Sequence, residues 1–79
     1  MYTTYILFSD AIQRYYTGYT SQNIDDRLYQ HNINHKGYTG KASDWKVIFN
    51  QLFDQKSSAL ALELKIKKNG AKRFLSRNI

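Results

Sequence analysis

The chain has 79 residues and no cysteine, which suits one small domain over residues 1–79 and excludes disulfides and cysteine-based zinc sites. A domain of this size has too small a core to enclose a large ligand cavity, so a functional site is expected in a surface groove. Twelve Lys and Arg against six Asp and Glu give a formal net charge of +6, which favours a polyanionic partner.

The first two segments predict a β-hairpin. Residues 1–8 and 14–20 are rich in aromatic and β-branched side chains and alternate with the period of a strand. If the hairpin closed symmetrically about residues 10–11, Tyr5 would lie directly opposite Tyr16. That turn lacks the preferred glycine, so a wider loop is expected and the register stays open. We expect the two tyrosines on the same face of the sheet.

A helix predicted from residue 23 to about residue 35 has polar residues beside its apolar stripe. Ile24 and Leu28 lie one turn apart, and Arg27 and His31 fall on the flank of the same stripe. For either residue alone a structural interpretation suffices, with Arg27 extended to solvent and His31 a hydrogen-bonded boundary residue. Together they also fit a polar site between helix and sheet, and both interpretations remain open.

The second half of the chain predicts a loop, a strand and a helix. Residues 37–43 indicate a flexible basic loop, and residues 45–53 indicate a third strand. Strict alternation in that strand would place Val47 and Phe49 on the same face. Ser57 or Ser58 is expected to cap a helix that runs to about residue 68. Residues 71–77 are expected to form a short basic helical tail.

The last long helix carries a carboxylate in its apolar arc. Glu63 falls among Leu62, Ile66 and other apolar residues, where an unpaired carboxylate is costly unless it has a charged partner or a metal ion. The structural alternatives are an ion pair with Arg27 or an edge position in water. Glu63 is the only acid after Asp54 in a lysine-rich segment, which favours a functional role.

Two further features concern binding partners. His31 and His35 have the i, i+4 spacing of a metal site but lack a third nearby ligand, which argues against one. From residue 65 to residue 77 there are six basic residues and no acid, and aromatics interleaved with basic side chains are typical of nucleic-acid surfaces. The alternative is that these aromatic residues fill the core of a small domain.

No apolar run is long enough to span a bilayer and no signal peptide is evident. We therefore expect no association with a membrane and a cytoplasmic location.

These landmarks, in this order and spacing, resemble the GIY-YIG endonuclease superfamily, in particular its short single-domain bacterial members related to the N-terminal domain of the excision-repair incision nuclease. The residues that carry the resemblance are Thr4-Tyr5-Ile6-Leu7, Tyr16-Thr17-Gly18-Tyr19-Thr20, Arg27-Leu28, Gln30-His31-Asn32, Trp45-Lys46, Ala59, Glu63 and Lys67. The first signature reads Thr3-Thr4-Tyr5 without its glycine, and the family's late asparagine has only Asn69 and Asn78 as candidates.

The resemblance implies an α+β fold in which a small three-stranded antiparallel sheet is flanked by helices, and metal-dependent hydrolysis of phosphodiester bonds. It assigns catalytic roles to Tyr5, Tyr16, Arg27 and His31, and the role of metal ligand, for Mg²⁺ or Mn²⁺, to Glu63. We expect DNA rather than RNA as partner. Its predicted contacts are the signature glycine and basic side chains: Gly18, Lys36, Lys41, Lys67, Lys68, Lys72 and Arg73.

Two other functions stay open at this point. The fold could serve as a nucleic-acid-binding module without cleavage, or as a basic interaction module in which Glu63 and Arg27 form a structural pair. The joint presence of Tyr5, Tyr16, Arg27 and Glu63 argues against simple binding, because binding alone does not need a carboxylate facing a phosphate.

Overall fold

The structure is a computed structural model, and it describes residues 1–33 and 38–78. Its elements, in chain order, are β1 (Tyr2–Ser9), β2 (Arg14–Thr20), α1 (Ile24–Ile33), the short 3₁₀ helix η1 (Tyr38–Lys41), β3 (Lys46–Phe53), α2 (Lys56–Asn69) and α3 (Ala71–Asn78). The three strands form an antiparallel sheet in the order β2-β1-β3. The predicted α+β class and its three-stranded antiparallel sheet are therefore confirmed.

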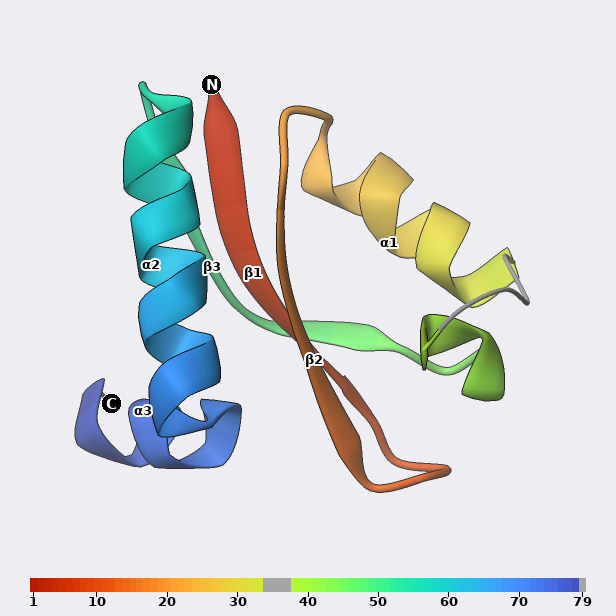
Figure 1. The fold of residues 1–79 in the computed structure, drawn as a ribbon. Helices are drawn as coiled ribbons and strands as arrows, with labels where there is room; N and C mark the ends of the chain where they lie inside the picture. Colours follow the sequence, from red (N-terminus) through yellow and green to blue (C-terminus); the bar gives the residue numbers. More distant parts are fainter. Residues whose placement is uncertain (34–37, 79) are drawn as a thin grey trace.

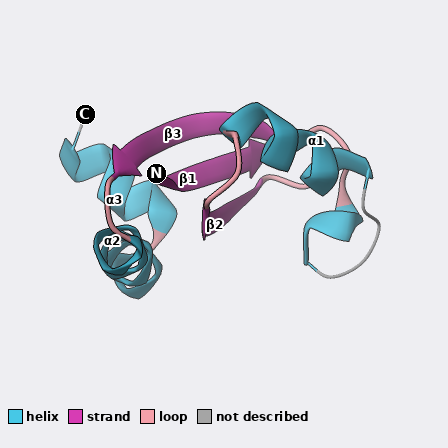
Figure 2. Ribbon diagram, turned by 90° about the horizontal axis from the view of Figure 1, so that it is seen from above, coloured by secondary structure: helices cyan, strands magenta, loops and turns pink. Residues whose placement is uncertain are grey.

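The helices lie on the two faces of this sheet (Figures 1 and 2). On one face α1 packs through Ile24 and Leu28 against a core of Tyr5, Leu7 and Trp45. The other face is covered by α2 and α3, where Ile66 of α2 and Phe74 of α3 form a second core with Ile6 of β1. Strand β1 contributes side chains to both cores, because successive side chains of a strand point to opposite faces of the sheet. Strand β2 is left as one edge of the sheet.

The hairpin register brings Tyr5 opposite Gly18, and Leu7 opposite Tyr16. The prediction of a loop wider than two residues is confirmed, since residues 10–13 connect the strands. Tyr5 does not lie directly opposite Tyr16, because the paired residues are symmetric about a point one residue further along the chain than a turn at residues 10–11 would require. The expected common face is confirmed, because Tyr16 and Gly18 are two residues apart and share a face.

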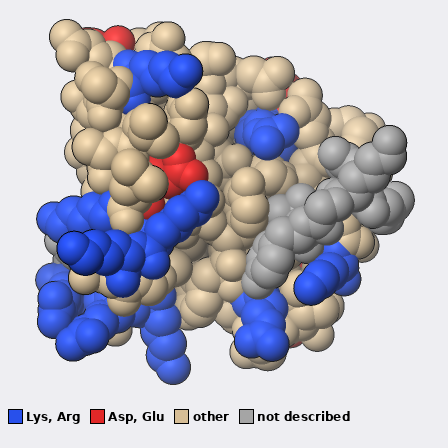
Figure 3. All heavy atoms as spheres, viewed as in Figure 1, with Lys and Arg blue, Asp and Glu red and all other residues tan. Residues whose placement is uncertain are grey.

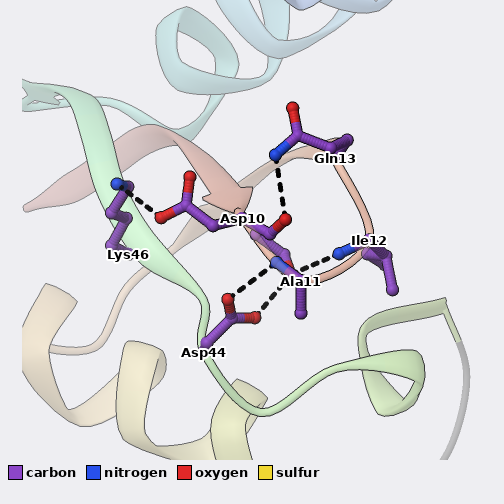
Figure 4. A network of polar contacts seen from close by, with 7 residues as sticks. Asp10, Ala11, Ile12, Gln13, Asp44 and Lys46 are labelled. Atoms are coloured by element: carbon purple, nitrogen blue, oxygen red, sulfur yellow. Dashed lines mark hydrogen bonds and ion pairs between the residues drawn. The ribbon is translucent and has the colours of Figure 1, made fainter.

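Asp44, which precedes β3, holds this loop in place (Figure 4). Its carboxylate accepts hydrogen bonds from the Ser9 hydroxyl at 2.5 Å and from the Ala11 N–H at 2.9 Å. These two hydrogen bonds lower the pKa of Asp44 below its usual value. Lys46 adds an exposed ion pair to Asp10 at 3.0 Å. The register of the hairpin is therefore supported by a contact with a residue distant in sequence.

A β-bulge in β3 changes the face of the sheet toward which its side chains point. Ile6 pairs with Phe49 but Leu7 pairs with Val47, so Ile48 is an extra residue between them. Val47 packs against the core under α1, whereas Phe49 packs against the core under α2 and α3. The prediction that Val47 and Phe49 share a face is wrong, because the bulge reverses the alternation at this point.

The helix boundaries differ from the predictions at several ends. Asn23 caps α1, since its side-chain oxygen accepts the Asp25 N–H at 2.8 Å. Helix α2 begins at Lys56 with Gln55 as N-cap, so the predicted caps Ser57 and Ser58 lie inside its first turn. The predicted loop over residues 37–43 contains η1. The predicted end of the first helix near residue 35 lies outside the described residues. None of the helices described is long and apolar enough to cross a membrane.

Candidate active site

Tyr5 lies in the middle of β1 and is only 1% exposed. Its ring crosses over Gly18 of the neighbouring strand: a Cβ atom added at Gly18 would lie 2.8 Å from the Tyr5 hydroxyl and 3.1 Å from the Tyr16 ring. No side chain larger than hydrogen fits at this position without moving a tyrosine. Gly18 therefore allows the Tyr5 hydroxyl to lie against the backbone of the edge strand.

Helix α1 brings His31 to this hydroxyl. The Tyr5 hydroxyl and His31 Nε2 are 2.8 Å apart, and both side chains are buried. The ring of Tyr16 completes the group, with its centroid 5.0 Å from that of His31 and 6.4 Å from that of Tyr5. Three of the four residues predicted as catalytic are thus gathered in one cluster of rings.

The position of His31 is fixed by its neighbour Asn32. The Asn32 side chain accepts the Trp45 N–H at 2.8 Å and donates to the Trp45 carbonyl oxygen at 3.1 Å. This pair of hydrogen bonds ties the C-terminal turn of α1 to the residue before β3. His31 is the residue before Asn32, so it has little freedom to move away from Tyr5.

Arg27, the fourth predicted catalytic residue, lies one turn before His31 on α1. It is partly buried, and its guanidinium donates to the Gln30 side-chain oxygen at 3.1 Å. The positive charge of Arg27 affects the pKa of both His31 and Tyr5. The pKa of His31 is lowered to about 4, by burial first and then by the charge of Arg27. At neutral pH His31 is therefore an uncharged imidazole.

Burial raises the pKa of Tyr5 above its usual value, although hydrogen bonding and charge from Arg27 act in the opposite direction. Tyr5 is accordingly a neutral phenol at pH 7, with a proton to donate. A neutral imidazole accepts a proton through Nε2 when its other nitrogen carries the hydrogen. In that tautomer the Tyr5 hydroxyl can donate to His31 Nε2; in the other tautomer Nε2 carries the hydrogen and donates to the hydroxyl oxygen. The charge of Glu63 is among the influences that raise the pKa of Tyr5, which links the two side chains electrostatically.

Glu63 is buried on α2, on the other face of the sheet. The Thr4 hydroxyl donates to the carbonyl oxygen of Ala59 at 2.7 Å, which anchors this helix to β1 one turn before Glu63. Glu63 Oε2 forms an ion pair with Lys67 Nζ at 2.7 Å. Among the described residues its charged partner is Lys67, on the same helix, and the alternative pairing with Arg27 is not the one the structure has.

The second carboxylate oxygen, Glu63 Oε1, is buried and has no hydrogen-bond partner among the residues that the structure describes. A buried polar atom without a partner is costly, so this oxygen fits a ligand that supplies positive charge. Among residues 1–33 and 38–78, no group of three or more His, Cys, Asp or Glu side chains is placed so that it could hold a metal ion. One carboxylate oxygen suits Mg²⁺ or Mn²⁺, since such ions keep several waters and take only one or two protein carboxylates.

The predicted nucleic-acid contacts lie on both sides of the edge strand. Lys67, Lys68, Lys72 and Arg73 are exposed on α2 and α3, and Figure 3 shows basic side chains gathered over these helices beside an acidic patch. Lys41 is exposed on η1, which lies at the far side of β2 from α2 and α3 (Figure 1). Lys36 lies outside the described residues.

A groove of about 360 Å³ runs between β2 and the junction of α2 with α3. It is lined by Tyr15, Tyr16, Thr17, Lys67, Gly70 and Ala71. This groove has no local sequence signal, because its two walls are about fifty residues apart along the chain. Asn32 and Thr4 had no predicted role, although each is a polar residue next to a position predicted to be functional: Asn32 follows His31 and Thr4 precedes Tyr5.

The model of the GIY-YIG catalytic domain family matches residues 1–76 of this chain. No curated protein and no solved structure matches it. The match covers nearly the whole chain and includes every residue of the cluster described above. The chain therefore belongs to the GIY-YIG catalytic domain family, which indicates a nuclease-type function.

Proposed function

We propose that the protein is an endonuclease that hydrolyses phosphodiester bonds in DNA with the help of Mg²⁺ or Mn²⁺, in the repair or processing of structured DNA in the cytoplasm. The observation that carries the proposal is the buried Tyr5 hydroxyl 2.8 Å from a neutral His31, beside Arg27. Family membership supports the nuclease class and a nucleic-acid substrate.

In this proposal Tyr5 activates the attacking water and His31 takes up the proton through Nε2. The shifted pKa values of Tyr5 and His31 both oppose this proton transfer. Tyr5 holds its proton more strongly than a free phenol, and His31 accepts one less readily than a free imidazole. Additional positive charge near the phenol is needed to favour the phenolate. Arg27 supplies part of it, and also offers a planar guanidinium to the scissile phosphate.

Glu63 is the residue that would hold the divalent ion, through Oε1, for which the described part of the chain offers no hydrogen-bond partner. When bound, such an ion lowers the pKa of a coordinated water and neutralises charge on phosphoryl oxygens. Family membership supports a general dependence on divalent metal. Tyr16 would orient the water, since its ring lies against that of His31.

The flanking DNA would be held by charge on both sides of β2. The side chains proposed for this are Lys41, Lys67, Lys68, Lys72 and Arg73. Contacts of this kind position the backbone without reading its sequence. Gly18 would contribute indirectly, because its lack of a side chain makes room for Tyr5.

A nucleic-acid-binding module without cleavage is the second candidate. The observation in its favour is the ion pair of Glu63 with Lys67, which gives the carboxylate a partner without any metal. The unpartnered Oε1 favours the nuclease, because one ammonium group satisfies only part of the carboxylate.

The proposal is tested by nicking of supercoiled plasmid with Mg²⁺ or Mn²⁺, comparing wild type with Glu63→Gln at equal protein concentration. Nicking that needs the metal and is lost in the variant supports the endonuclease. No nicking by either protein, with salt-sensitive DNA binding by both, favours the binding module. Equal nicking by both proteins indicates a contaminating nuclease.

A further inference from the structure

Lys67 occupies a position between two features of the site. Its ammonium group lies 2.7 Å from Glu63 Oε2, and its side chain also lines the groove beside β2. The Lys67 side chain is 52% exposed whereas the Glu63 side chain is 10% exposed. The lysine is thus the partner with freedom to move, because a long exposed side chain changes rotamer readily while a buried carboxylate does not.

The groove has the features of a phosphate-binding surface. The aromatic edge strand forms one wall through Tyr15 and Tyr16, and the α2 and α3 junction forms the other. Two further exposed basic side chains, Lys72 and Arg73, follow directly after the lining residue Ala71. With its ammonium group on Glu63, Lys67 is partly neutralised and contributes less attraction to a phosphate in this groove.

We propose that Lys67 is an exchangeable counter-ion, which neutralises Glu63 in the metal-free protein and is released by a divalent ion to bind a DNA backbone phosphate in the groove. A divalent ion at Glu63 competes for the same carboxylate and repels the ammonium group. The inference rests on the proposed function, since it takes Glu63 as the metal ligand.

Exchange of this kind couples metal binding to DNA binding. Release of Lys67 strengthens phosphate binding only when the metal is present, and by linkage DNA that holds Lys67 in the groove strengthens metal binding by the same factor. The neighbouring Lys68 provides the matched control. It is exposed on the same helix and adjacent in sequence, but the ion pair of Glu63 is with Lys67.

The test titrates Mn²⁺ into wild type, Lys67→Met, Lys68→Met and Glu63→Gln by calorimetry without DNA. Binding of a short DNA duplex is then measured in Mn²⁺ and in EDTA, and the duplex is checked on a gel afterwards. We expect Lys67→Met to bind Mn²⁺ about five- to tenfold more tightly than Lys68→Met, because the competing ammonium is gone. We expect its loss of DNA affinity to be several-fold larger in Mn²⁺ than in EDTA.

Equal Mn²⁺ affinity in the two methionine variants would overturn the inference, as would a loss of DNA affinity in Lys67→Met that is the same with and without metal. If wild type shows no Mn²⁺ binding that Glu63→Gln removes, the metal site of the proposed function itself fails. Circular dichroism of each variant verifies that the fold is retained, so that these outcomes stay distinct.

Discussion

The Tyr5 hydroxyl and His31 Nε2 lie 2.8 Å apart, and the two residues come from the central strand and from the helix on one face of the sheet. Three features maintain this distance. Gly18 leaves room for the tyrosine ring, Asn32 ties the end of α1 to Trp45, and the side chains of Tyr5 and His31 are buried. The site therefore depends on packing and on hydrogen bonds as much as on the reacting groups.

Replacing Gly18 with alanine is expected to displace Tyr5, because the new Cβ would lie 2.8 Å from its hydroxyl. Overpacking of this kind costs about 1–3 kcal/mol of unfolding free energy. Denaturant unfolding measures it. The cost should be smaller in a Tyr5→Phe background, where the closest atom is absent. An equal cost in both backgrounds would show that the hydroxyl is not the obstacle.

The burial of His31 predicts a pH-dependent stability. Its pKa is about 4 in the folded protein against an ordinary value of 6.5, so the unfolded chain binds more protons between these values. The stabilisation is complete above pH 6.5 and is lost as the pH falls toward about 4. The expected loss is roughly 2–3 kcal/mol.

Denaturant melts of wild type and His31→Gln across this pH range isolate the effect, because other groups, His35 included, are present in both proteins. Wild type should lose stability more steeply than the variant as the pH falls. Parallel pH profiles for the two proteins would contradict a buried neutral His31.

Asn32→Ala is expected to destabilise the protein by about 1–3 kcal/mol, because it removes both hydrogen bonds between the Asn32 side chain and the backbone of Trp45. Its cleavage rate should fall as well, since His31 is next in sequence. The exposed Gln51→Ala on β3 serves as control, with changes within about 0.5 kcal/mol expected. Unfolding midpoints and single-turnover cleavage measure the two effects, and an Asn32 variant that matches the Gln51 variant would contradict this role.

Arg27→Lys keeps the charge but loses the planar guanidinium. We expect cleavage to fall by about 10–100-fold while DNA affinity changes by less than about threefold, because a paired hydrogen-bonding geometry is lost rather than a charge. Single-turnover rates and equilibrium DNA binding separate the two. A variant with wild-type rate would show that Arg27 acts only through its charge.

Much of this architecture was predictable from local patterns. The alternation of β1, the cap at Asn23 and the aromatic strand at residues 14–20 all follow from periodicity and side-chain chemistry, and the structure has them. The two unusual features, polar residues on the stripe of α1 and Glu63 in an apolar arc, were visible for the same reason. They break patterns that a core would otherwise impose.

The remaining details depend on contacts between distant residues. The hairpin register is supported by Asp44, more than thirty residues from the loop it binds. The bulge at Ile48 sends Val47 and Phe49 to different cores, which alternation within one strand does not reveal. The pairing of Glu63 with Lys67 instead of Arg27 depends on which face of the sheet each helix covers. None of these has a local sequence signal.

The most direct test of the central claim is the single-turnover DNA cleavage rate of Tyr5→Phe, measured with saturating protein and Mg²⁺ or Mn²⁺. Tyr29→Phe is the matched control, because Tyr29 is 65% exposed on the same helix as His31 and Arg27. If the Tyr5 hydroxyl activates the water, its removal should lower the rate by about 10²–10⁴-fold with DNA affinity unchanged. A Tyr5→Phe protein that cleaves as fast as wild type and Tyr29→Phe would contradict the account.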